Sequence, residues 1–353
     1  MVSIRSATSV LVLLVGASTQ LALGNYFQSV GASSVKAKDV SADGSVVVGA
    51  TPSYAFRWTH DEGMTILGAG GAWAVSADGS VVVGHSQQSG LSPRACRWTE
   101  SEGLQIIDNN LNSPFSNEAW AYGVSGSGSV VVGRAQSPSG WQPFRWTATG
   151  GMKDMGSGVP YAVSDDGRIV VGGNIGHATE AWRYVSGRWE DLGMLPGAIE
   201  SDAYGISADG KVIVGSSSGR ACMWQESGDI VDLGQLDGSP SYALDASGDG
   251  SVIVGYGFTP GSATLSDKRA LIWDSAHGIR PLQDVLSRDY GLDTTGWILH
   301  QANAVSDDGK TFVGYGTGPD GDWEGWVAVI PEPATIALVA LGGTGMVLRR
   351  KRR

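Results

Sequence analysis

The chain is poor in cysteine. Its 353 residues include two cysteines, Cys96 and Cys222. Both occupy a position that Phe56 and Phe144 fill in other copies of an internal repeat. A position that accepts either Phe or Cys is a buried packing position, so the sequence predicts two separate buried thiols rather than a disulfide.

Basic side chains are also scarce in the body of the chain. The formal net charge is −11. Without Arg5, Glu332 and the five basic residues at 349–353, 18 basic and 34 acidic side chains remain, a net charge of −16. A body this acidic repels phosphate backbones and anionic membranes, which argues against nucleic acid as a partner.

No catalytic constellation stands out. The histidines are scattered without ligand spacing to Cys or carboxylates, which argues against zinc: His60, His85, His177, His277 and His300. The glycine-rich stretches 68–72 and 342–345 do not precede a phosphate-binding Lys. The pairs Asp165-Asp166 and Asp307-Asp308 lie in predicted turns, where turn chemistry explains them and calcium stays an open alternative. We therefore expect a protein that is not an enzyme and holds no cofactor.

What the chain has is a repeat. Seven segments share one pattern, in which Ser begins and Gly ends a four-residue turn: 41–44, 76–79, 125–128, 164–167, 207–210, 247–250 and 306–309. Ser or Asp bonds to nearby backbone and Gly supplies positive φ, so each segment predicts a type I turn with a G1 bulge between antiparallel strands.

Strands follow each turn. A Val-rich run such as Val46-Val47-Val48 comes first, then a strand such as Phe56-Arg57-Trp58, and then a fourth strand such as 64–68. Unbroken β-branched runs are typical of strands covered on both faces. The turn glycines lie 35 to 59 residues apart, which is the size of a propeller blade.

The repeat predicts an all-β fold over 25–329, a seven-bladed β-propeller of four-stranded antiparallel blades. The seventh repeat lacks a fourth strand, and Tyr26–Gly31 is a strand without a repeat. We expect this N-terminal strand to close the ring, since closure removes an exposed edge. A β-solenoid or a sandwich remains an alternative. In repeat six, Leu282, Val285 and Leu286 share helical spacing and predict a short helix.

These repeats resemble the HAF family of extracellular repeats. Val40–Gly49 and Ala55–Trp58 carry its characteristic words almost unchanged, and the likeness extends over about residues 26 to 330. Repeats three and seven depart from it most. The resemblance implies a secreted bacterial protein and brings no established catalytic residues.

The two ends predict export. Residues 1–24 have the order of a signal peptide: Arg5, an apolar run, then small residues ending at Gly24. Residues 330–353 combine Pro331, Glu332 and Pro333 with an apolar stretch (334–348) and five basic residues. Fifteen apolar residues are short for a stable span, which disfavours a plain tail anchor. This tail resembles the PEP-CTERM sorting signal. The resemblance implies transient membrane anchoring, cleavage by an exosortase after signal peptidase has acted, and a cell-surface or extracellular destination.

One set of side chains is a candidate binding site. Aromatic residues precede the turn in several repeats, and polar residues take their place in repeats one and seven: Trp73, Tyr122, Tyr161, Tyr204, Lys38 and Asn303, with Tyr242 as an uncertain sixth aromatic position. In a propeller these residues begin the innermost strands near one channel mouth, where they can stack on sugar rings or simply pack between blades.

The sequence therefore predicts a surface-sorted structural or binding module, with extracellular polysaccharide as the candidate ligand. A polysaccharide lyase or glycoside hydrolase and a protein–protein adhesion platform are the alternatives. The first would need convergent carboxylates at the mouth, and the second a large exposed apolar patch.

Overall fold

The computed structural model describes residues 24–31, 33–87, 92–107, 118–173, 180–261 and 264–331. The proposed signal peptide before Gly24, His177, and the tail from Glu332 onward lie outside the described residues. Within the described ranges, no helix is both long and apolar enough to cross a membrane.

The described chain is built from antiparallel β-sheets, of which one has seven strands and the others have four. The first sheet is the seven-stranded one. It contains β2 (Lys36–Val40), β3 (Val46–Ala50), β4 (Tyr54–Thr59), β5 (Gly63–Val75), β6 (Val81–Ser86), β7 (Arg94–Thr99) and β8 (Gly103–Ile106). The next two sheets contain β9 (Ala119–Val124), β10 (Val130–Ser137), β11 (Gly140–Thr147) and β12 (Gly151–Asp154), and then β13 (Val159–Val163), β14 (Ile169–Gly173), β15 (Ala181–Val185) and β16 (Arg188–Gly193).

Three further four-stranded sheets follow. They contain β17 (Ser201–Ile206), β18 (Val212–Ser217), β19 (Arg220–Gln225) and β20 (Ile230–Gly234); β21 (Ser241–Ala246), β22 (Val252–Phe258), β23 (Lys268–Asp274) and β24 (Gly278–Pro281); and β25 (Ile298–Val305), β26 (Thr311–Thr317), β27 (Trp323–Val329) and β1 (Tyr26–Ser29). Short helical turns occur at Leu236–Gly238, Leu265–Asp267, α1 (Leu282–Asp284) and Val285–Asp289. The last two hold the helix predicted there, and Leu282, Val285 and Leu286 are buried.

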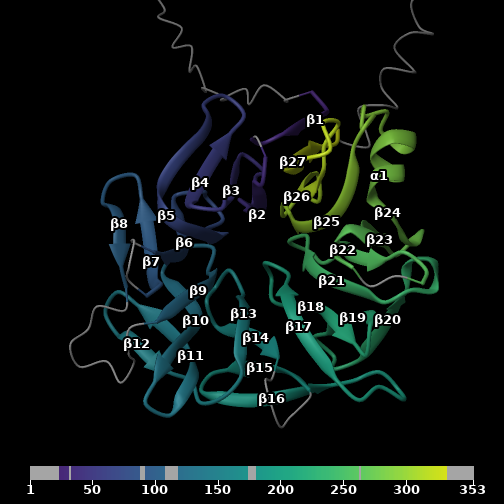
Figure 1. The fold of residues 1–353 in the computed structure, drawn as a ribbon. Coiled ribbons are helices and arrows are strands. Elements are labelled where there is room, and N and C mark those ends of the chain that lie inside the picture. Colours follow the sequence, from purple (N-terminus) through teal and green to yellow (C-terminus); the bar gives the residue numbers. More distant parts are fainter. Residues whose placement is uncertain are drawn as a thin grey trace, which may run out of the picture.

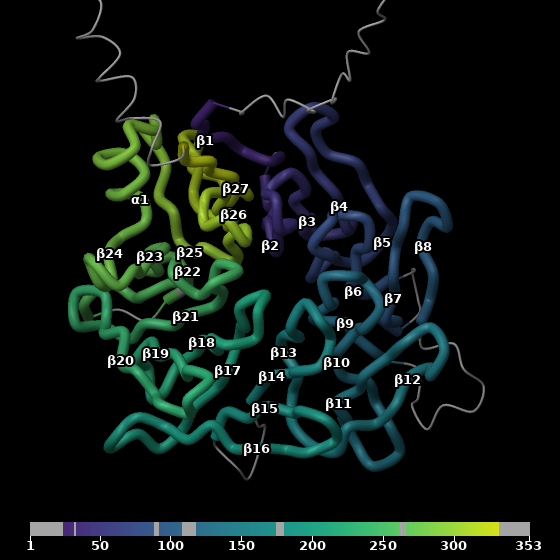
Figure 2. Tube along the Cα trace, turned by 180° about the vertical axis from the view of Figure 1, so that it is seen from behind, coloured from purple at the N-terminus to yellow at the C-terminus, as the bar shows by residue number. Residues whose placement is uncertain are grey.

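The sheets are arranged radially around a common centre, and the chain colours advance around the ring in Figure 1. Figure 2 shows the same order from behind. Each inner strand contacts the inner strands of its two neighbours, and β2 contacts β25. Inner strands from the whole chain therefore surround one axis.

One sheet differs from the expected four strands. β5 pairs with β4 through its first half and with β6 through its second half, so it joins two four-stranded groups into one sheet of seven. The junction contains Gly68 and Gly70, both with positive φ. Glycine adopts this backbone freely, so the chain turns from an outer to an inner strand without a loop.

The N-terminal strand joins the C-terminal sheet. β1 pairs antiparallel with β27, from Tyr26 opposite Val329 to Ser29 opposite Trp326. The Val30 amide then donates to the Gly325 carbonyl at 3.0 Å. Val30 lies in a buried cluster that combines residues of β2–β4 with residues of β25–β27. The two ends of the described chain are thus packed together.

The recurring turn has one hydrogen-bond pattern. In the first copy, the Gly44 amide donates to the Ser41 carbonyl, the Val46 amide donates to Ser41 Oγ, and the Ser41 hydroxyl donates to Asp43 Oδ1. Gly44 has φ of 74°. The Ser side chain thus satisfies backbone inside a buried turn, which explains why Ser opens every copy.

The core contains the packing positions that the repeat predicts. The Val-rich strands are buried between sheets, and the third strand contributes a buried side chain opposite each strand-ending Gly: Phe56, Cys96, Phe144, Trp182, Cys222, Leu271 and Trp326. Cys96 and Cys222 are both buried and form no disulfide, so the prediction of separate thiols is confirmed.

Candidate functional site

A β-bulge in every inner strand points one residue at the centre of the ring. The pairing skips one residue at the same position in each inner strand: Lys38, Trp73, Tyr122, Tyr161, Tyr204, Leu244 and Asn303; β25 carries a second bulge at His300. Bulges re-aim side chains in this way. All seven line one central cavity. The six residues singled out from the sequence are therefore brought together.

The expectation for Tyr242 is wrong. Leu244 takes the bulge position in its sheet, three residues before Ser247, as Trp73 stands three residues before Ser76. Tyr242 lies two residues earlier and stacks on Tyr256, with ring centroids 4.9 Å apart. The aromatic side chain at 242 misled the sequence interpretation, whereas the constant offset from Ser gives Leu244.

A glycine on the neighbouring strand makes room for each bulge. A Cβ on Gly133 would lie 2.0 Å from the Trp120 carbonyl oxygen, and a Cβ on Gly172 would lie 2.0 Å from that of Val159. The same approach recurs at Gly49, Gly84, Gly215, Gly255 and Gly314. Glycine is needed there because the two backbones approach closely. The Gly that follows each Val-rich run is therefore a sequence signal for the bulge on the neighbouring strand.

Members of the ring contact one another between sheets. Lys38 Nζ lies 4.9 Å from the Trp73 ring centroid, Trp73 meets Tyr122 edge-on at 6.2 Å, and Tyr161 lies 5.4 Å from Tyr204. The Trp73 indole also donates to His85 Nδ1 at 3.0 Å. The aromatic side chains therefore pack between sheets and at the same time line the cavity. All of them remain half-buried.

The cavity has two parts. Its mouth has a volume of about 400 Å³ and is lined by Trp73, Tyr122, Arg134, Val159, Tyr161, Tyr204 and Leu244. A deeper part of about 200 Å³ lies along the inner strands. Polar groups line most of the deeper part, and aromatic rings line the mouth.

Arg134 forms one wall of the mouth. Its guanidinium carbon lies 4.8 Å from the Trp141 ring centroid and 5.9 Å from that of Tyr122. Its Nε is buried and has no hydrogen-bond partner among the described residues. A cation held against aromatic faces is stabilised electrostatically. The mouth thus combines aromatic surface with a fixed positive charge.

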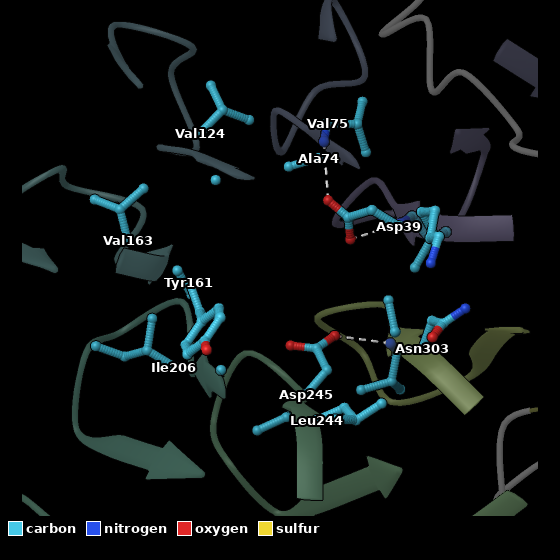
Figure 3. Close-up of a pocket in the computed structure, with 18 of the residues that line it drawn as sticks. Asp39, Ala74, Val75, Val124, Tyr161, Val163, Ile206, Leu244, Asp245 and Asn303 are labelled. Carbon is cyan, nitrogen blue, oxygen red and sulfur yellow. Dashed lines mark hydrogen bonds between the residues drawn. The ribbon is translucent and has the colours of Figure 1, made fainter. Parts of the chain in front are cut away.

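Two carboxyl groups lie deeper, and sequence reasoning missed both. Asp39 and Asp245 follow the bulge residue, a position that is Ala or Gly in the other inner strands. Asp39 Oδ2 accepts the Val75 amide at 2.8 Å, and Asp245 Oδ2 accepts the Val305 amide at 2.9 Å, each from the next inner strand. Figure 3 shows both groups pointing into the cavity. The sequence signal for these two groups was an Asp at a position that is Ala or Gly in the other repeats.

Burial disfavours the charged form of both groups. It raises the pKa of Asp39 to about 6, although the Val75 and Val40 amides act in the opposite direction. Burial and, second, the Asp39 carboxylate raise the pKa of Asp245 to about 8. Both side chains keep some accessible surface because they face the cavity, which the inner strands line.

The Asp245→Asn variant is expected to gain stability at alkaline pH. The folded-state pKa of Asp245 lies above the value of about 3.9 for unfolded Asp, so the folded state binds the proton more tightly. The free energy of unfolding therefore falls as pH rises from about 4 through about 8. Asn keeps an acceptor for the Val305 amide and removes the charge. We expect little change in Tm at pH 5 and a rise of about 5 °C at pH 9.

Thermal unfolding at the two pH values checks this expectation. Asp320→Asn is the matched control, because its carboxyl is exposed before β27 and its loss should change Tm little at either pH. An equal gain at pH 5 and pH 9 for Asp245→Asn would contradict the assignment.

The paired carboxylates considered for calcium diverge. Asp166 and Asp308 accept the hydroxyl protons of Ser164 and Ser306 inside their own turns. Their neighbours Asp165 and Asp307 line the far end of the cavity. Among the described residues, no group of three or more His, Cys, Asp or Glu could hold a metal ion.

One hydrolase-like pattern occurs in the chain and was not singled out from the sequence. Residues 215–219 read Gly-Ser-Ser-Ser-Gly, but they form the hairpin between β18 and β19 rather than a strand-to-helix turn. Ser217 is buried, where its Oγ accepts the Leu195 amide at 3.0 Å. This serine is therefore a structural hydrogen-bond partner, not a nucleophile elbow.

Comparisons with known proteins identify the tail and the fold. The PEP-CTERM protein-sorting motif matches residues 329–353. This match marks an exported protein with a C-terminal membrane-anchoring signal and implies exosortase processing. No curated protein matches the chain.

Solved structures resemble the chain at low sequence identity. The tricorn protease is similar at 12% identity with a TM-score of 0.51, over 86% of this chain and 34% of that one. A putative TolB from Agrobacterium tumefaciens has 13% identity and a TM-score of 0.43 over 85% and 91% of the two chains. TolB from Acinetobacter baumannii has 12% identity and a TM-score of 0.47 over 86% and 78%. At these identities the likeness concerns the fold alone, which is all-β and propeller-like.

Proposed function

We propose that the chain is one seven-bladed β-propeller in which β1 supplies the missing strand of the last blade. Seven bulged inner strands surround the cavity, and β5 serves two blades. The pairing of β1 with β27 supports closure, as does the Asp307 amide, which donates to the Ala42 carbonyl at 3.0 Å. In this arrangement β1 covers the strand edge that β27 would otherwise expose.

We further propose that this propeller is a HAF-type, surface-sorted module that binds extracellular polysaccharide. The observation that carries the proposal is the mouth of the cavity, where aromatic residues from successive blades surround about 400 Å³. Aromatic faces provide apolar surface for sugar rings, and the polar groups among them provide hydrogen bonds. The sorting motif supports a place at the cell surface, where such polymers are found.

One observation favours a second candidate, a polysaccharide lyase or glycoside hydrolase. Asp39 and Asp245 converge on the cavity, and two carboxyl groups with separated pKa values are typical of glycosidases. Two features favour binding instead. Each carboxyl already accepts a backbone amide, and the deep cavity of about 200 Å³ is smaller than typical ligand sites of about 300 Å³ or more.

A protein–protein adhesion platform has less support. The large exposed apolar side chains among the described residues are Tyr54, Ile66, Trp141, Trp189, Ile199 and Ile298. They lie on β4, β5, β11, β16, β25 and a loop, spread around the ring. An adhesive face would gather such residues into one patch.

The Tyr122→Ala/Tyr161→Ala double variant tests the saccharide proposal. Both rings line the mouth and also the deeper part of the cavity. We expect the exported protein to bind matrix polysaccharide in affinity electrophoresis and the variant to bind at least about tenfold more weakly, since each ring contributes about 1 kcal/mol.

Trp189→Ala is the control, because it removes an aromatic side chain from the outer strand β16. Equal retention of the wild type and the double variant would contradict the proposal. Release of new sugar ends by the wild type, lost in Asp245→Asn, would instead favour the enzyme.

A further inference from the structure

Three lysines lie near one another beside the central cavity, and Lys38 lines its deeper part. Lys36 and Lys38 come from β2, and Lys268 begins β23. Each ammonium lies over an aromatic ring: Lys36 over Tyr315 at 5.2 Å, Lys38 over Trp73 at 4.9 Å and Lys268 over Tyr256 at 3.6 Å from the centroid. We call Lys36, Lys38 and Lys268 the seam lysines, since Lys36 and Lys38 lie in the first sheet where it packs against the last, and Lys268 contacts Gln301 of the last sheet.

The seam lysines have no carboxylate partner among the residues that the structure describes. The lysine ion pairs among the described residues involve Lys211 and Lys310, and no carboxylate lies within 4.0 Å of a seam lysine. The chain carries 35 acidic against 24 basic side chains, so acidic partners are abundant elsewhere. Three ammonium groups without an adjacent carboxylate give this part of an acidic protein a local excess of positive charge.

The three charges affect one another. Burial and, after it, the Lys36 and Lys268 charges lower the pKa of Lys38 to about 8. Burial and Lys36 lower the pKa of Lys268 to about 8. Like charges held close together in a partly desolvated site are unfavourable, and an anion placed between them would relieve the repulsion.

A polar network fixes this side of the cavity. Lys268 Nζ and the Tyr315 hydroxyl both donate to Gln301 Oε1, at 3.0 Å and 2.9 Å. Gln301 Nε2 donates to Asn303 Oδ1 at 2.7 Å, and Asn303 Nδ2 donates to the Ala37 carbonyl. Donors therefore occupy the acceptor of Gln301, while two protons of the Lys268 ammonium remain for a ligand. The site is prepared for an acceptor, not for a donor.

We infer that the seam lysines bind the anionic group of an acidic saccharide, a uronate carboxylate or a sulfate ester, while its sugar rings lie along Tyr122, Tyr161 and Tyr204. This inference rests on the proposed saccharide-binding function and names the ligand class. Lys38 adjoins Trp73, and Trp73 adjoins Tyr122, so the cationic and aromatic sides are continuous. One polymer chain can contact both.

The test compares polygalacturonate, dextran sulfate and neutral dextran on the full exported protein. We expect the wild type to bind at least one anionic polymer about tenfold or more tightly than dextran, with affinity falling as NaCl is raised. Lys36→Gln/Lys38→Gln should lose about tenfold on that polymer, and Lys36→Arg/Lys38→Arg should retain most of the affinity. The two anionic arms distinguish carboxylate from sulfate.

Lys153→Gln on the outer strand β12 is the matched control for loss of charge, and Tm measurements confirm that each variant is folded. Two outcomes would overturn the inference: dextran binding as tight as that of the anionic polymers, or a Gln double variant that equals Lys153→Gln. If binding depends on Tyr122 and Tyr161 but not on the lysines, only the ligand class is wrong. If no saccharide binds, the proposed function fails and the inference with it. Equally tight binding of polyphosphate would also overturn it, as an anion site without sugar recognition.

Discussion

Val30→Asp is expected to open the ring at its junction and to lower Tm by about 10 °C. Val30 is 2% exposed and packs with Val35, Val313 and Val327 in the cluster shared by the first and last sheets. A carboxylate there has no partner within an apolar cluster, and burying an unpaired charge costs about 4 kcal/mol. The strand β1 would detach and leave β27 as an exposed edge.

Asn25→Asp is the control, because it adds the same charge at an exposed position beside β1. Thermal unfolding followed by circular dichroism compares the two variants, and hydrogen exchange locates the opening. Protection should fall first in β1 and β27. A Val30→Asp protein as stable as Asn25→Asp would show that the two ends do not hold the ring together.

The turns and strands could be predicted from sequence because their physical causes are local. The Ser hydroxyl, the positive-φ Gly and, in every turn except that of repeat three, the Asp carboxylate lie within six residues of one another. Seven copies then repeat the signal. Even the pairing of β1 with β27, a long-range contact, followed from counting strands and finding one missing at one end and one left over at the other.

The residues that face the central cavity could be predicted from their constant distance to the turn Ser, but not from the type of their side chains. The bulge stands three residues before Ser in every repeat, because the facing Gly fixes the skipped residue. Choosing Tyr242 for its aromatic ring broke that offset, and Leu244 took its place. Backbone geometry, not side-chain type, decides which residue faces the cavity.

The charged groups could not be predicted because several strands must meet before they become a site. Lys268 is more than 200 residues from Lys36, and it begins β23. Asp39 and Asp245 are ordinary surface-type residues in sequence, and their raised pKa values come from the burial that the assembled inner strands create. Long-range assembly therefore supplies the electrostatics of the site.

Gly133→Ala is expected to destabilise the protein by about 4 kcal/mol and to displace Tyr122 from the ring. The new Cβ would lie 2.0 Å from the Trp120 carbonyl oxygen and 2.9 Å from Phe144 Cζ. β10 cannot shift away, because it is paired with β9 on one side and β11 on the other. The bulge in β9 must therefore deform, and overpacking against fixed backbone is costly.

Gly103→Ala separates this clash from the general cost of replacing glycine. Gly103 has φ of 66° and open space around its Cα, so Ala there should cost only about 1 kcal/mol of left-handed backbone strain. Chemical denaturation measures both variants, and near-ultraviolet circular dichroism reports the aromatic ring. Equal stability losses would mean that the neighbouring strand yields easily. The bulges would then be adaptable, and the ring of central side chains would not be fixed by the strand-ending glycines. A much larger loss at Gly133, with an altered aromatic spectrum, would tie the geometry of the cavity mouth to the glycines that face the bulges.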